Sequence, residues 1–140
     1  MPVGEFLRMV PGAQVVLDEV VASDPEFYGP WAWGSVDDSL EFLLQAFSRP
    51  VLLPLLRAGA EADEAAVRAC FAYVEFLVSD PNACLESSVY FGILEQFLES
   101  REVLVRAWRH SLPVTREKLA AMLEHYPATY RELRESGDLG

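Results

Sequence analysis

Apolar residues at helical spacing between residues 61 and 100 constrain the fold of this 140-residue chain more than any other feature. In EADEAAVRACFAYVEFLVSD and in PNACLESSVYFGILEQFLES they recur at steps of three and four residues, as in amphipathic helices. Between the two segments, Ser79-Asp80-Pro81 supplies a helix cap and a proline suited to a first helical turn. A connection this short predicts an antiparallel helical hairpin over about residues 61–100. Its stripes are Val67, Cys70, Phe71, Val74, Leu77 and Val78, then Leu85, Val89, Ile93 and Phe97.

The rest of the chain also predicts helices at residues 4–10 and 13–22, at residues 101–110 with Ser100 as the cap, from about Thr115, and from Pro127. A helix capped by Ser35 or Asp37 is expected to end at Ser48-Arg49-Pro50, and PVLLPLL to form a short helix that ends at Gly59. No alternating run of β-branched residues predicts a strand. We therefore expect one all-α domain over residues 1–140, a bundle of about six to eight helices built on the central hairpin. HEAT-like stacking of helix pairs and compact packing both stay open.

Acidic residues dominate the charge of the first hundred residues. The whole chain has a net charge of −11, residues 1–100 hold sixteen acids and four bases, and residues 101–140 hold six acids and seven bases. Binding to a nucleic-acid backbone requires a basic surface, so we expect no nucleic-acid partner. A strongly acidic face favours solubility and accelerates encounter with a basic protein.

Residues with catalytic or metal-binding chemistry do not form recognisable motifs. His110 and His125 have no carboxylate or cysteine at a metal-ligand spacing, and no phosphate loop, dinucleotide fingerprint or nucleophile elbow is present. Glu75, Glu86 and Glu95 lie in the predicted hairpin, where we expect them to bind backbone groups or arginines such as Arg68. The sequence therefore predicts a protein that is not an enzyme and holds no metal or cofactor.

The N-terminus and the cysteines indicate a cytoplasmic protein. MPVGEFLRMVPG lacks the basic start and apolar core of a signal peptide. No single apolar run reaches the roughly 18–20 residues of a membrane span, because the longest, Pro50–Leu56, is short and contains two prolines. Cys70 and Cys84 are expected to be reduced core thiols. We expect no membrane contact.

Acidic and aromatic side chains are concentrated between Asp24 and Phe47, a stretch without a base. Aromatic side chains ringed by acids are typical of a binding surface for a basic protein, since Trp and Tyr dominate interface hot spots. The alternative is that the loop tryptophans cover the end of the bundle and the acids cap the next helix. Phe42 and Phe47 are assigned to the core. The predicted partner-binding residues are Asp24, Glu26, Phe27, Tyr28, Trp31, Trp33, Asp37, Asp38 and Glu41.

Three segments resemble a family of small all-helical bacterial proteins of unknown function. They are FAYVEFLVSD at Phe71–Asp80, VYFGILEQFLES at Val89–Ser100 and the upstream YGPWAWGSVDDSLEFLL. The family includes proteins regarded as immunity proteins, which are encoded beside secreted polymorphic toxins. The chain departs from the family in its proline-rich PVLLPLL element and its two neighbouring tryptophans. The resemblance implies a cytoplasmic protein-binding role and no catalytic residues.

Together these patterns predict an immunity protein that neutralises a basic bacterial toxin by direct binding. The alternative is a structural or regulatory helical adaptor that associates with itself as a homodimer through the same surface.

Overall fold

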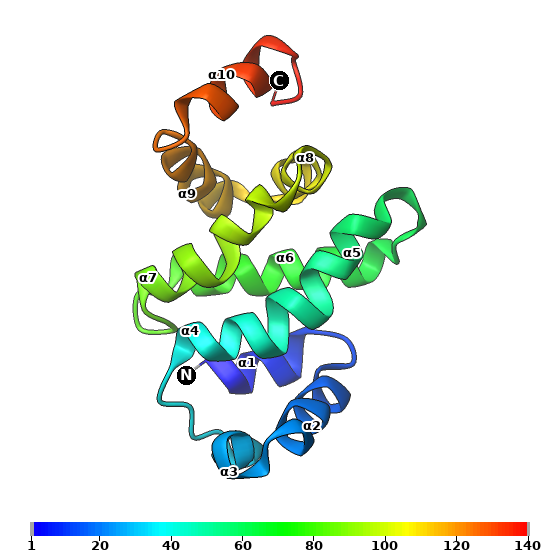
Figure 1. The fold of residues 1–140 in the computed structure, drawn as a ribbon, viewed down its shortest axis with the longest axis vertical. Helices are drawn as coiled ribbons and strands as arrows, with labels where there is room; N and C mark the ends of the chain where they lie inside the picture. The colour runs from blue at the N-terminus through cyan, green and yellow to red at the C-terminus, as the bar shows by residue number, and fades with distance from the viewer. Residues whose placement is uncertain (1, 140) are drawn as a thin grey trace.

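Helices stacked along one long axis form the protein, as the computed structural model of residues 2–139 shows (Figure 1). Within these residues there is no strand, which confirms the predicted all-α class. The first three helices lie at one end, α4 to α7 in the middle and α8 to α10 at the other end. The termini therefore lie in different layers of the molecule.

The first layer consists of α1 (Pro2–Met9), α2 (Ala13–Ser23), the single turn α3 (Pro25–Tyr28) and the 3₁₀-helix η1 (Gly29–Trp33). Phe6 of α1 is fully buried and joins this layer to the middle one. Its ring lies 5.4 Å from that of Phe42 and 5.9 Å from that of Tyr73, measured between centroids. Such edge-on aromatic contacts add to the free energy gained by burying the rings.

One long helix crosses the middle layer, and the predicted break at Ser48-Arg49-Pro50 is wrong. It runs without interruption through α4 (Ser39–Phe42), the π-helical η2 (Leu43–Leu52) and α5 (Leu53–Ala58), and the short 3₁₀ turn η3 (Gly59–Glu61) follows its end. In an α-helix the ring of Pro50 would collide with the carbonyl four residues earlier. The wider π turns relieve this collision, because their hydrogen bonds reach back five residues. The sequence pattern gives no sign of this change in helix type.

The start of this helix also differs from the prediction. Asp38 is the N-cap, because its Oδ1 accepts a hydrogen bond from the Glu41 backbone N–H at 3.1 Å. Ser35 and Asp37, the predicted caps, lie before the helix. Val36 is buried between them, so these residues must stay extended until Asp38. At the other end, Gly59 follows α5 with a positive φ of 60°, as predicted.

Because the helix does not break, the 23-residue stretch Ser39–Glu61 is long and apolar enough, by length and composition, to cross a membrane. Our expectation treated it as two shorter helices. However, 44% of its most apolar window is buried inside the fold, and the core helix of a soluble protein meets the same criteria.

The predicted central hairpin corresponds to α6 (Glu64–Ser79) and a second helix made of α7 (Glu86–Val89), η4 (Tyr90–Leu94) and η5 (Glu95–Glu99). Pro81 is not in the first turn of the second helix, as expected, but in a turn before it. Asp80 stabilises this turn by accepting a hydrogen bond from the Asn82 N–H at 2.9 Å. Most contacts of α6 are with α1 and α9, which lie far from it in sequence. A HEAT-like solenoid packs only sequence neighbours, so these contacts favour the compact bundle.

The last layer contains α8 (Arg101–His110), α9 (Pro113–Leu123) and α10 (Pro127–Glu135). Ser100 caps α8 as predicted, and its Oγ lies 3.2 Å from the Val103 N. Pro127 begins α10 as predicted, whereas α9 begins at Pro113 rather than near Thr115. This layer is joined to the middle one mainly through α6, which packs on α9, and α5, which packs on α8.

A half-buried carboxylate on α6 forms the strongest polar link between these layers. Glu75 accepts hydrogen bonds from the backbone N–H of Val114 at 3.1 Å and of Thr115 at 2.7 Å. It also accepts one from the Thr115 hydroxyl at 2.8 Å. These donors lie at the start of α9, where a helix has free N–H groups and favours negative charge. The expected backbone role of this glutamate is confirmed.

We expect the substitution Glu75→Ala to lower the free energy of unfolding by about 1–3 kcal/mol, because it leaves the donors at the start of α9 without their acceptor. Urea denaturation followed by circular dichroism measures this. Glu117→Ala is the matched control, since Glu117 is exposed on α9, and should change stability by less than about 0.5 kcal/mol. Equal stabilities of the two variants would contradict the role of Glu75.

A close crossing of η2 and η4 depends on Gly92. A Cβ added there would lie 3.1 Å from the Leu43 Cβ and 3.3 Å from the Leu40 Cδ1. The buried Ser48 hydroxyl donates a hydrogen bond to the Gly92 carbonyl at the same crossing. The two backbones approach this closely only because residue 92 has no side chain.

The substitution Gly92→Ala should therefore destabilise the protein by about 1–3 kcal/mol through overpacking. Gly4→Ala is the control: Gly4 is in α1 with nothing near its Cβ position, so alanine should stabilise α1 by about 0.5–1 kcal/mol. Thermal denaturation of both variants measures these effects. A neutral Gly92→Ala would show that this crossing is not tight.

Candidate functional site

Two of the predicted binding carboxylates cap helices while facing solvent. The Asp24 Oδ1 accepts a hydrogen bond from the Phe27 N–H at 3.2 Å and begins α3, and Asp38 begins α4 as described above. Both side chains belong to exposed residues. The two alternatives considered for these acids are therefore compatible: they order the loop and still present their charge.

The two tryptophans of η1 have opposite environments. Trp31 is only 4% exposed, and its ring lies 4.6 Å from that of Tyr28 and 5.3 Å from that of Phe42. The prediction that Trp31 contacts a partner is thus wrong, and its role is to close the end of the core. Trp33 is 79% exposed. A 3₁₀-helix has three residues per turn, so side chains two positions apart point roughly 120° away from each other.

Tyr28 and Glu41 form a pair that is partly buried rather than a free binding group. The Tyr28 hydroxyl donates a hydrogen bond to the Glu41 Oε1 at 3.0 Å. Burial raises the pKa of Tyr28, and the hydrogen bond to Glu41 raises it further. The pair fixes α3 against α4, so we assign it to positioning of the surface and not to direct contact.

The other predicted binding residues are aromatic rings and carboxylates that the structure leaves exposed. Phe27 is 58% exposed, and its ring packs edge-on against Tyr28 with 4.8 Å between centroids. Glu26 and Asp37 are exposed and form no hydrogen bond or ion pair with another residue among 2–139. Residues 9–48 contain seven acids and no base. We define the acidic–aromatic surface as Asp24, Glu26, Phe27, Trp33, Asp37 and Asp38.

Among residues 2–139, no group of three His, Cys, Asp or Glu side chains is placed to hold a metal ion. The ring of His110 stacks on that of Phe71 at 5.8 Å. Cys70 is buried, and burial raises the pKa of its thiol to about 12. Glu95, the third predicted hairpin carboxylate, accepts a hydrogen bond from the Tyr126 hydroxyl at 3.4 Å. These groups therefore have packing or hydrogen-bonding roles.

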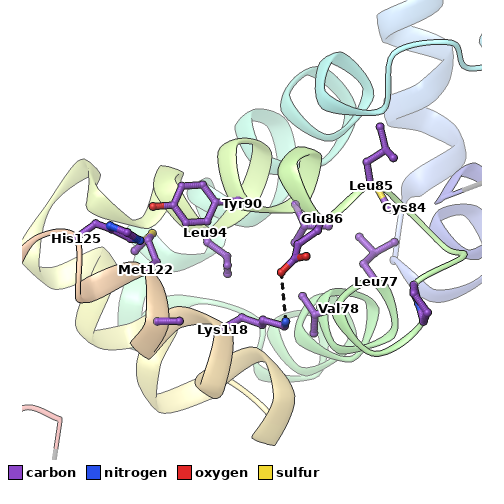
Figure 2. A pocket seen from close by; sticks show the side chains of 13 residues that line it. Leu77, Val78, Cys84, Leu85, Glu86, Tyr90, Leu94, Lys118, Met122 and His125 are labelled. Carbon is purple, nitrogen blue, oxygen red and sulfur yellow. Dashed lines mark hydrogen bonds and ion pairs between the residues drawn. The ribbon is translucent and has the colours of Figure 1, made fainter.

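A cavity between α6, α7 and α9 is a feature that the sequence did not predict (Figure 2). Its volume is about 440 Å³, and most of the side chains that line it are apolar. Leu85 lies at its edge and is exposed, although its helical spacing assigned it to the core.

No protein-family model, curated protein or solved structure matches this chain. The resemblance to the family that includes immunity proteins therefore stays a prediction, based on the three segments given above.

The different burial of the two tryptophans predicts a large difference in stability between their alanine variants. Trp31→Ala should lower the free energy of unfolding by about 3–5 kcal/mol, because it leaves a cavity beside Phe42. Trp33→Ala should change it by less than about 0.5 kcal/mol. Urea denaturation measures both values. Acrylamide quenching of two variants that keep only Trp31 or only Trp33, with Trp108 also replaced by phenylalanine, provides a second test. Strong quenching of Trp31 fluorescence in the folded protein would contradict this assignment.

Proposed function

We propose that this chain is a non-catalytic module that binds a basic protein through the acidic–aromatic surface. The observation that carries the proposal is the exposure of Trp33 and Phe27 in a segment, residues 9–48, that contains seven acids and no base. Exposed large aromatic side chains contribute much of the energy in protein interfaces. An exposed tryptophan on an ordered turn loses little conformational freedom when it binds, which favours affinity.

The charges set the chemistry of the partner. Seven acids between residues 9 and 48, together with a net charge of −11, attract basic proteins over long distances and repel phosphate backbones. The free carboxylates of Glu26 and Asp37 can form ion pairs without breaking an existing contact. A basic protein is therefore the partner that this surface favours.

We propose further that the partner is a bacterial toxin, and that binding in the cytoplasm neutralises it. The support is the resemblance of Phe71–Asp80 and Val89–Ser100 to the family that includes immunity proteins. High affinity for one basic partner, with no reaction performed by this chain, is what such a role requires. The alternative, a self-associating adaptor, would use the same exposed Trp33 and Phe27.

Site-specific crosslinking tests the proposal. A photoreactive phenylalanine analogue at position 33 should crosslink a single basic protein in cells of the source organism, and the same analogue at position 117 on α9 should not. Mass spectrometry identifies the product. A product made of two copies of this chain would instead support the adaptor, and no product at position 33 would contradict the surface.

With the purified partner, the double variant Glu26→Gln, Asp37→Asn should associate roughly three- to tenfold more slowly at low salt, and depend less on salt. Trp33→Ala should mainly speed dissociation and weaken binding by about 2 kcal/mol or more. The control Glu117→Gln, Glu124→Gln changes the net charge equally but lies on α9 and at its C-cap. Biolayer interferometry measures both rate constants. Equal slowing by the control would show that only net charge matters.

A further inference from the structure

The cavity between α6, α7 and α9 has the size and lining of a ligand site. Its volume of about 440 Å³ lies within the range of roughly 300–1,000 Å³ that is typical of small-molecule pockets. Apolar side chains from all three helical segments line it: Leu77, Val89, Leu94 and Met122 are almost fully buried beneath it, and Leu85 is exposed at its edge. Pocket walls of this kind favour an aliphatic group over a polar one.

An ion pair crosses this cavity, and two further polar side chains lie at one end of it. Lys118 of α9 and Glu86 of α7 face each other across it, with 3.3 Å between Nζ and Oε1 (Figure 2). His125 and Tyr90 lie together at one end of the cavity. A ligand that fits must therefore combine an aliphatic body with one polar head group.

The exposure of the two charged side chains decides the sign of that head group. The Lys118 side chain is 39% exposed, so its stem forms part of the wall, whereas the Glu86 side chain is 85% exposed although its carboxylate is directed toward Lys118. An exposed ion pair contributes little to stability, so another carboxylate can replace Glu86 at little cost. A cationic ligand would have to displace Lys118 from the wall. The geometry therefore favours an anionic head group.

We propose that this cavity binds a medium-chain aliphatic monocarboxylate. The chain covers the exposed Leu85 and lies above the buried Met122, and the carboxylate replaces Glu86 as the partner of Lys118. Tyr90 and His125 can donate further hydrogen bonds at the edge. The site shares no residue with the acidic–aromatic surface, although the start of α4 contacts α7 through the Ser39–Ser88 hydrogen bond at 2.7 Å.

Methyl NMR of the full chain labelled with ¹³C-methyl methionine tests for binding at this place. Titration with octanoate should shift the Met122 signal, since Met122 lines the cavity, and leave the signal of Met9 in α1 unchanged. Affinity should rise roughly fifteenfold from hexanoate to octanoate and again to decanoate, because each step buries two more methylene groups. Equal shifts at both methionines, or no dependence on chain length, would overturn the proposal.

Isothermal titration calorimetry of variants tests whether Lys118 recognises the carboxylate of the ligand. Lys118→Met should weaken octanoate binding roughly two- to fivefold and leave 1-octanol binding unchanged, and Glu86→Gln should strengthen octanoate binding by a similar factor. Arg68→Met is the matched control, since Arg68 is an exposed cation on α6 outside the cavity. If octanol and octanoate bind equally to the unmodified protein, the cavity is an apolar site only and the proposed carboxylate recognition is wrong.

A bulky side chain that fills the cavity tests the location of the ligand without changing any charge. Ala121 is exposed at its edge, so Ala121→Phe should block octanoate binding while keeping the thermal denaturation midpoint of the parent protein. Cys84 also lines the cavity, so octanoate should slow its alkylation by iodoacetamide in the parent protein and not in Ala121→Phe. Unchanged octanoate binding to a folded Ala121→Phe would place the ligand elsewhere and overturn the proposal.

Discussion

The hydrogen bonds of Glu75 to the start of α9 are the constraint on which the last layer of this fold depends. One carboxylate on α6 satisfies the Val114 and Thr115 backbone donors and the Thr115 hydroxyl. Free donors at a buried helix start would be costly, so α9 must begin opposite Glu75. This fixes which face of α9 meets α6 and therefore places Lys118 opposite Glu86.

Periodicity and capping residues were sufficient to predict the all-α class and several helix ends. Ser100, Pro127 and Gly59 act locally, and each was assigned correctly. The errors arose where a contact distant in sequence decides the local structure. Pro50 signals a break, but the long helix passes it with π turns. Asp38, and neither Ser35 nor Asp37, caps the helix, because the side chain of Val36 is buried in the core before the helix begins.

The candidate sites show the same division between local and distant information. The concentration of acids and aromatic residues in the sequence indicated the acidic–aromatic surface, but it could not show that Trp33 is exposed and Trp31 buried. That difference depends on the 3₁₀ turn and on the position of Phe42. The cavity was not predictable, because its lining comes from three helices whose packing the sequence does not state. Leu77 and Met122 each look like ordinary core residues when their own helices are considered alone.

The uneven charge of the chain makes the two proposed sites compatible in one small protein. The strongly acidic first hundred residues favour a basic partner at α3 and η1, and the same field would repel an anionic ligand nearby. Lys118 lies instead in residues 101–140, whose net charge is +1. Screening at physiological salt limits the field of exposed charges to about 8 Å, so the first layer affects an anion at Lys118 only weakly. The acidic residues of α3 lie far from α9 along the long axis (Figure 1), whereas Asp38 lies closer to the cavity, because the neighbouring Ser39 forms a hydrogen bond with Ser88 of α7 at 2.7 Å.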